Sequence, residues 1–281
     1  PKHAASKKGF NDFVIDGKLV SFEDRFEIIE THAAPVFRKI IGARAVTNLS
    51  DAERKKVSKF IAVQSFRTAA FFEGMRTGED RSDFGRIFTQ LWDSFFLISD
   101  QIQKRPWALM VIEHDDVFYL GDHPVVHQFT KDPNVRYLGF DIQGVEAFLP
   151  LTPKIALYIP CSSTSSQIIK AYEDAAIIHK CIRISALSGK RQQKGEAEAL
   201  QMSQGILLRA HALYQALTTG VSVKAKSENI ENLNYLQSSW AHSMIYSNQR
   251  DFAFAKHVFQ KTPQYREFPK TSVAIISPLN R

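Results

Sequence analysis

The 281-residue chain lacks the motifs that mark the best-defined catalytic classes. It contains no glycine-rich GxGxxG or Walker A loop, no HExxH, no CxxC and no GxSxG. These absences exclude the well-marked dinucleotide-binding proteins, P-loop nucleotidases, zinc proteases and serine hydrolases. Enzymes that work without any of these motifs are not excluded.

Cysteine is also scarce, because only Cys161 and Cys181 occur. Their spacing matches no zinc-binding pattern, and so few cysteines in a chain of this length are typical of a reducing compartment. No apolar run approaches the roughly 18 residues that a membrane-spanning helix needs. The first residues have no apolar core of the signal-peptide kind. We therefore expect a cytoplasmic protein with no membrane partner.

The composition is that of a globular protein with an excess of basic residues. Hydrophobic residues make up 44% and charged residues 23%, the formal net charge is +7, and the sequence pI is about 9.3. Such a balance suits an acidic partner such as nucleic acid, and it equally suits a solvated basic surface. The clusters that favour nucleic acid are a loop with Lys190, Arg191 and Lys194 and an arm with Lys2, Lys7 and Lys8. Aromatic residues do not interleave with them, so no base-stacking platform is visible.

Helical periodicity predicts helices in both halves of the chain. We expect one from Ser21, interrupted at Pro35, and a second from the capping box Ser50–Glu53 to Gly74 or Gly78. An aromatic third helix over 82–103 ends before Pro106. In the second half we expect a short helix over 168–176, a long helix over 196–217 ended by Gly220, and a last helix over 227–246.

The stretch from Trp107 to Val126 has the densest set of reactive side chains and predicts a β-hairpin. One apolar run leads to a polar tip at 113–116, and a second run, 117–120, leads back to Gly121-Asp122-His123-Pro124. The tip resembles a metal-binding His-Asp pair, but at a hairpin it is also typical of a solvated turn. Further strands are expected at 137–140 and 182–184, with a second hairpin formed by 147–150 and 155–159.

Asp122 and His123 are the candidate catalytic pair, because a carboxylate beside an imidazole can share acid–base work or orient the ring. The alternative for Asp122 is a turn aspartate that accepts backbone hydrogen bonds. His127 lies on the same face as His123 in an extended chain, but about 13 Å away, too far to share a metal ion. The sequence therefore predicts no metal site and leaves any cofactor unspecified.

The order of several short motifs resembles the bacterial family known as domain of unknown function 4238. The family's Ser-Asp-Asn-Pro-Val signature corresponds here to Gly121-Asp122-His123-Pro124-Val125, after the strand Trp107-Ala108-Leu109-Met110. The departures are Gly121 and His123, where the family tends to have Ser and Asn, and the missing opening His-Tyr-Val-Pro. The other matching elements are Pro150-Leu151-Thr152-Pro153, Ile29-Glu30, Ala33-Ala34-Pro35, Gln64-Ser65-Phe66-Arg67-Thr68 and Asn232-Leu233-Asn234.

We predict an α+β fold in which N- and C-terminal helices pack around a small, mostly antiparallel β-sheet. The expected organisation is an arm over 1–20, one domain over 21–262 and a tail over 263–281. Two functions stay open. One is a hydrolase or nuclease-like enzyme acting on nucleic acid or another phosphate-bearing substrate, with Arg67 and Asn234 as the substrate contacts that the resemblance implies. The other is a non-catalytic module that binds nucleic acid or a protein partner, and the oligomeric state is left open.

Overall fold

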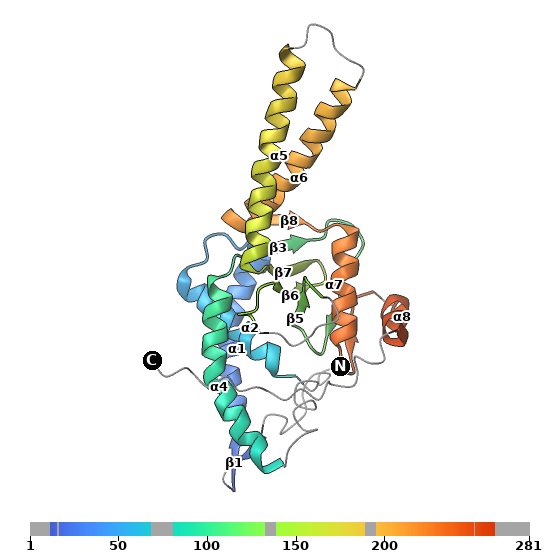
Figure 1. Cartoon of the computed structure of the whole chain (residues 1–281). Helices are drawn as coiled ribbons and strands as arrows, with labels where there is room; N and C mark the ends of the chain where they lie inside the picture. The colour runs from blue at the N-terminus through green and yellow to red at the C-terminus, as the bar shows by residue number, and fades with distance from the viewer. Residues whose placement is uncertain are drawn as a thin grey trace.

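A five-stranded sheet between two helical layers forms the centre of the molecule, and a two-helix arm projects from it (Figure 1). The computed structural model describes residues 12–68 (except 16), 81–132, 139–188, 195–249 and 251–261. The predicted α+β class is confirmed. No helix among these residues is long and apolar enough to cross a membrane.

The central sheet has the strand order β5-β6-β7-β3-β8. Its strands are β3 (Ala108–Val111), β5 (Val126–Phe129), β6 (Val145–Thr152), β7 (Ile155–Ile159) and β8 (Ser222–Lys224). Only the β3–β8 pair is parallel, so the predicted mostly antiparallel sheet is confirmed. The predicted second hairpin is β6–β7, and its register shifts between Pro150 and Thr152, where proline lacks an N–H for the ladder.

The predicted hairpin over 107–126 is wrong in its pairing, although the chain does turn at 114–115. Strand β3 pairs with β7 and β8, and residues 117–119 form no strand. The β6–β7 turn lies between the two arms instead: Ile112 N donates to the Lys154 carbonyl at 2.9 Å, and Phe118 N donates to the Pro153 carbonyl at 2.9 Å. Strand β4 (Leu120–Gly121) pairs with β9 (Ile245–Tyr246).

The N-terminal layer begins with a hairpin of β1 (Asp12–Ile15) and β2 (Lys18–Ser21), followed by α1 (Glu23–Ala43), α2 (Asp51–Phe66) and α4 (Arg81–Lys104). The capping box is confirmed, since the Ser50 hydroxyl accepts from Glu53 N and the Glu53 carboxylate accepts from Ser50 N. The predicted α4 and its end before Pro106 are also confirmed.

Two predictions for this layer are wrong. Helix α1 runs unbroken through Pro35, with Ala33, Val36 and Ile40 buried against the core on either side. It begins at Glu23, with Phe22 as its N-cap, rather than at Ser21. Helix α2 ends at Phe66, where the backbone of Arg67 leaves the helical conformation, and the expected end at Gly74 or Gly78 lies outside the described residues.

Two hydrophobic clusters cover the two faces of the sheet. On one face, Leu109, Leu149 and Leu157 pack with Ile40 of α1 and Ile61 of α2. On the other face, Met110 and Phe148 pack with Ile230, Leu233 and Trp240 of α7 (Ser227–Trp240). Strand residues of odd and even number thus face opposite helical layers, as the pleat requires.

Helices α5 (Ser162–Ser188) and α6 (Glu196–Thr219) form the arm. The predicted helix over 168–176 is confirmed but is part of a much longer helix, and the predicted strand over 182–184 is wrong, because one continuous helix packs along α6. Tyr172 stacks on Tyr214 with ring centroids 4.5 Å apart, and His179 Nδ1 lies 3.0 Å from Ser203 Oγ. Helix α6 and its end at Gly220, which adopts the left-handed conformation, are as predicted.

The C-terminal part differs from the prediction in its boundaries. Helix α7 ends at Trp240 rather than Tyr246, and an unpredicted helix α8 (Ala253–Lys261) follows. Gly139 and Phe140 lie in a turn region rather than a strand. The basic loop 189–194, including Lys190, Arg191 and Lys194, and the segments 1–11 and 262–281 lie outside the described residues.

Candidate functional site

Asp122 anchors the segment that follows α7. Its carboxylate accepts backbone hydrogen bonds from His242 at 2.7 Å, Ser243 at 2.8 Å and Met244 at 3.1 Å, and one from the Ser243 hydroxyl at 2.8 Å. These amides are more than a hundred residues away in sequence. Asp122 therefore accepts backbone hydrogen bonds from a distant segment rather than from its own turn. These four donors give the carboxylate a structural contact network that occupies both oxygens.

Two amide side chains of α7 hold the irregular segment 117–124. Asn234 accepts from Tyr119 N at 2.7 Å and donates to the Val117 carbonyl at 2.9 Å. Gln237, one helical turn on, accepts from Gly121 N at 2.7 Å and donates to the Pro124 carbonyl at 3.0 Å. A carboxamide can bond a donor and an acceptor together, so α7 supplies the pairing that a neighbouring strand would give. We refer to these four hydrogen bonds as the amide clasp.

His123 is buried beside Trp240 of α7. Its side chain is only 1% exposed, and its ring lies 4.9 Å from the Trp240 ring. The ring of His127 contacts the same indole at 5.7 Å. Burial, then the neighbouring His123 and Arg105, lower the pKa of His127 from 6.5 to about 3, so this imidazole stays neutral at physiological pH.

Arg67 lies in a separate part of the fold. Its guanidinium pairs with Glu30 of α1 and lies 4.6 Å from the centre of the Phe26 ring. Asp122, His123 and Asn234 therefore gather at α7, whereas the contacts of Arg67 tie α2 to α1. The catalytic role of Asp122 and His123 stays a prediction, and their observed contacts support the fold.

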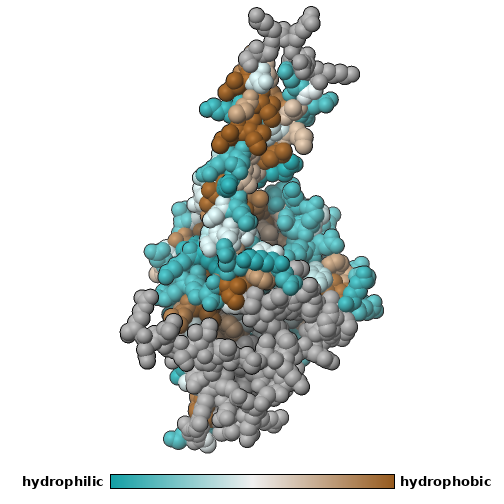
Figure 2. Space-filling model, viewed as in Figure 1, coloured by the Kyte–Doolittle hydropathy of each residue, from teal (hydrophilic) through white to brown (hydrophobic). Residues whose placement is uncertain are grey.

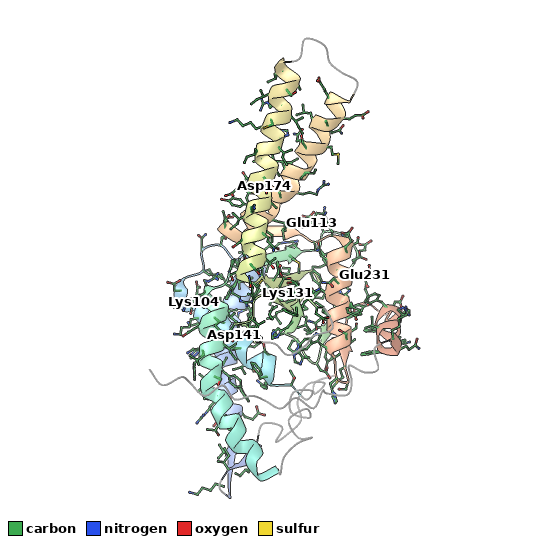
Figure 3. The ribbon with its side chains drawn as sticks, viewed as in Figure 1. Lys104, Glu113, Lys131, Asp141, Asp174 and Glu231 are labelled. Carbon is green, nitrogen blue, oxygen red and sulfur yellow. The ribbon has the colours of Figure 1, made fainter. Side chains whose placement is uncertain are left out.

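The polar tip at 113–116 is an exposed turn with local ion pairs. His114 Nδ1 lies 3.2 Å from Asp116, Lys154 Nζ donates to the His114 and Asp116 carbonyls, and Glu113 pairs with Lys224 at 2.8 Å. Figure 3 labels Glu113 beside the β3–β8 edge. Across the described ranges, no group of three or more His, Cys, Asp or Glu side chains gathers closely enough to hold a metal ion.

A pocket of about 650 Å³ lies on the α7 side of the sheet, between the sheet and helices α6 and α7. We call it the α6–α7 pocket. Its floor is made by the side chains of β3, β6 and β7 that face this layer, including Met110, Phe148 and Tyr158. Its walls carry three cationic side chains, Arg209, Lys224 and Lys226, together with Glu228, Asn229 and Asn232. Pockets that bind small molecules typically combine such an apolar lining with a few polar groups.

Glu146 is the buried acid of this pocket, with a side chain that accepts a 2.9 Å hydrogen bond from the Tyr158 hydroxyl. Burial raises its pKa, although hydrogen bonds from Thr164 and Tyr158 and the charge of Arg105 act in the opposite direction. Burial and the Glu146 carboxylate also raise the pKa of Tyr158. A buried acid with a raised pKa in a pocket is typical of an acid–base residue.

Cys161 lies close to this acid, at the start of α5. Its sulfur lies 2.9 Å from Ser163 Oγ and accepts from Thr164 N at 3.4 Å. Burial opposes ionisation of the thiol, but hydrogen bonds from Ser163, Thr164 and Gly144 outweigh it and lower its pKa. Cys161 is buried and, unlike Glu146, does not line the α6–α7 pocket.

The family model described as Protein of unknown function (DUF4238) matches residues 1–251. The chain belongs to this family. No curated protein and no solved structure matches the chain. The resemblance drawn from the order of the motifs is thus confirmed, and the DUF4238 elements can be placed. The element at Glu30 pairs with the one at Arg67, and the element at 121–124 is held by the clasp from α7.

Sequence reasoning missed the pocket residues of this DUF4238 member. Glu146 had a usable signal, because it is the one charged residue in the otherwise apolar run of β6. Arg209 had none, because an arginine on a long helix is usually solvated. Outside the pocket, the sequence indicated Asn234 as a substrate contact but not Gln237, although the two amides at helical spacing share a face of α7 with Leu233 and Trp240.

Replacing Asn234 by Ala should destabilise the protein by about 3 kcal/mol, because a buried N–H and a buried carbonyl both lose their partner. Asn232→Ala is the matched control, since Asn232 on the same helix bonds only the Gln128 side chain, at 3.0 Å, and should cost less than about 1 kcal/mol. The free energy of unfolding in urea measures both. Equal losses for the two variants would contradict the clasp.

The low pKa of His127 predicts acid sensitivity. The unfolded chain takes up a proton at His127 near pH 6.5, whereas the folded protein does so only near 3. Stability should therefore be complete above pH 6.5 and fall toward pH 3, by up to about 1.4 kcal/mol per pH unit. His127→Phe should remove about 2 kcal/mol of the loss between pH 7 and 5 in urea unfolding. The control is His257→Phe at an exposed position of α8, and an unchanged pH slope in His127→Phe would refute the assignment.

Proposed function

We propose that this protein binds a small molecule with an apolar body and a phosphate or carboxylate head in the α6–α7 pocket, and hydrolyses it with Glu146 as the general acid. The observation that carries the proposal is the composition of one pocket: a buried acid on an apolar floor, beneath three cationic side chains. The proposal keeps the predicted hydrolase and its phosphate-bearing substrate. It moves the reacting group from Asp122 and His123 to Glu146.

The cations supply the recognition of an anion. Lys224 already pairs with Glu113 at 2.8 Å, but Arg209 and Lys226 form no ion pair with a described carboxylate. Their charges are therefore available to a ligand, and arginine in particular can bind phosphate or carboxylate through two parallel N–H donors. Glu228 also lines the pocket and would repel an anion placed beside it.

The floor supplies the recognition of an apolar body. Phe148 stacks on Tyr158 with ring centroids 4.9 Å apart and ring planes 17° apart, which presents a flat aromatic surface. Leu213 and Leu217 of α6 face it across the pocket. A ligand that fills about 650 Å³ has the size of a typical metabolite. Its apolar part would lose its hydration against this surface.

Glu146 supplies the chemistry. Because burial raises its pKa, a larger share of this side chain keeps its proton than for an exposed glutamate. It would pass that proton to the leaving oxygen as water attacks the ester group and the ester bond breaks, and the proton released by the water would then restore Glu146. Tyr158 orients the carboxyl group through its hydroxyl. The second predicted function, a non-catalytic binding module, uses the same pocket without the proton transfer, so binding and turnover are tested separately.

Binding is tested with octyl phosphate by titration calorimetry. Arg209→Ala should weaken binding about 10- to 100-fold, as expected for the loss of a charged hydrogen bond. Arg183→Ala, which removes an exposed arginine from α5, should leave the affinity unchanged. Affinity should also fall as salt rises. Equal affinities of the Arg209 and Arg183 variants would refute the placement of the anion.

Turnover is tested with p-nitrophenyl phosphate and p-nitrophenyl octanoate. Glu146→Gln should lower kcat at least about 100-fold, because it removes the general acid, while octyl phosphate binding changes less than threefold. Glu228→Gln is the control for the loss of a carboxylate at the same pocket. Binding by the wild type without turnover of either ester, or full activity of Glu146→Gln, would leave the binding module as the function.

A further inference from the structure

The arm carries apolar side chains on the face of α5 that points away from α6. Ile177 is 62% exposed and Ile184 is 55% exposed, and Cys181 is exposed between them. Their spacing of four and then three residues places them in one line along the helix. We call this line the α5 stripe. Ile178 and Leu187, which are 55% and 78% exposed, flank it.

These residues differ from the face that packs on α6. The side chains of Tyr172, Ala175 and His179 lie toward α6, and Tyr172 and His179 make the ring and hydroxyl contacts described above. The α5 stripe begins one turn beyond the charged pair Glu173 and Asp174, the second of which is labelled on the arm in Figure 3. Figure 2 shows hydrophobic side chains gathered on the outer part of the arm, above many hydrophilic side chains where the arm meets the body.

We propose that the α5 stripe is a homodimer interface, in which α5 of a second copy packs antiparallel against it. The stripe reads almost the same in both directions, with one isoleucine at each end and a cysteine between. A two-fold axis between residues 180 and 181 would place Ile177 against Ile184 of the second copy, and the two Cys181 residues side by side. Such self-complementarity is what an isologous interface requires.

The available area fits a dimer. The four exposed isoleucine and leucine side chains present apolar surface on the order of 500 Å² per copy, so two copies would bury at most about 1,000 Å². This reaches the lower limit of a stable specific interface. The stripe itself contains no charged side chain, so it offers no ion pair that would favour a charged partner over a second copy of this chain.

The geometry of the arm also permits the arrangement. With the axis between 180 and 181, Ser188 of one copy lies opposite Glu173 of the other, and the helices overlap over 173–188. This overlap is about 24 Å long. Residues 162–172 of each copy then separate the overlap from the body, and the arm projects clear of the sheet in Figure 1. The two bodies would lie at opposite ends of the paired arms.

Sedimentation velocity of the full chain over a range of concentrations tests the dimer. The wild type should dimerise, and Ile177→Glu/Ile184→Glu should weaken the dimer at least 100-fold with an unchanged circular dichroism spectrum. Ile28→Glu, an isoleucine on α1 that is 56% exposed, is the matched control and should dimerise normally. A wild type that stays monomeric, or a dimer that survives the double substitution, overturns the proposal.

The direction of the pairing is tested in two further ways. Ile177→Glu/Ile184→Lys should recover the dimer, because each acid then faces a base of the second copy only if the helices are antiparallel. Mild oxidation of the wild type should give a covalent dimer that Cys181→Ser abolishes, whereas the buried Cys161 stays unreacted. Wild-type chains that oxidation leaves uncrosslinked, or recovery absent in the charge-swapped variant, would overturn the antiparallel register.

Discussion

The amide clasp is the interaction on which the arrangement of the C-terminal half depends. Residues 117–119 are buried but belong to no strand, so their backbone donors and acceptors need partners that a sheet does not provide. Asn234 of α7 supplies them for Val117 and Tyr119, and Gln237 does the same for Gly121 and Pro124 further along the segment, at distances of 2.7 to 3.0 Å. Because an unsatisfied buried amide or carbonyl costs about 1–3 kcal/mol, four satisfied groups fix the position of α7 firmly. The Asp122 carboxylate likewise accepts hydrogen bonds from backbone amides in the loop after α7.

The position of α7 determines where the pocket lies. Ile230, Leu233 and Trp240 cover one part of the second sheet face, and helices α5 and α6 leave the body along another. The α6–α7 pocket occupies the remaining area, where Glu146 and Tyr158 face away from the N-terminal helices. The acid is buried there because its neighbours on β6 are apolar on both faces. The hydrogen bonds of Asn234 and Gln237 thus help to fix the helix whose first turns line the pocket.

The sequence predicted those parts of the fold whose signals are local. The Ser50–Glu53 box, helix α4 and the β6–β7 hairpin each follow from spacing or capping within a few residues. The hairpin over 107–126 failed because β3 pairs with segments some 45 and 110 residues further on, and no local pattern records which strand fills that position. The Ile182–Ile184 alternation failed because three residues cannot outweigh a helix of 27 residues packed on a neighbour.

The candidate site shows the same division. Asp122 and His123 stood out because several reactive side chains lie close together in the sequence there. Such a group of polar residues also occurs where a bend in the chain needs side chains to bond its backbone. The pocket residues come from strands β3, β6, β7 and β8 and from helices α6 and α7, and most of them have an unremarkable neighbourhood in the chain. Only Glu146 contradicts its surroundings, as a carboxyl group in a buried apolar strand. Burying a carboxyl group is costly unless it is protonated or hydrogen-bonded, and burial in the pocket raises the pKa of Glu146 while the Tyr158 hydroxyl bonds its carboxyl oxygen. That energetic cost is the strongest physical reason to place the chemistry at Glu146 rather than at Asp122, whose oxygens are held by four donors.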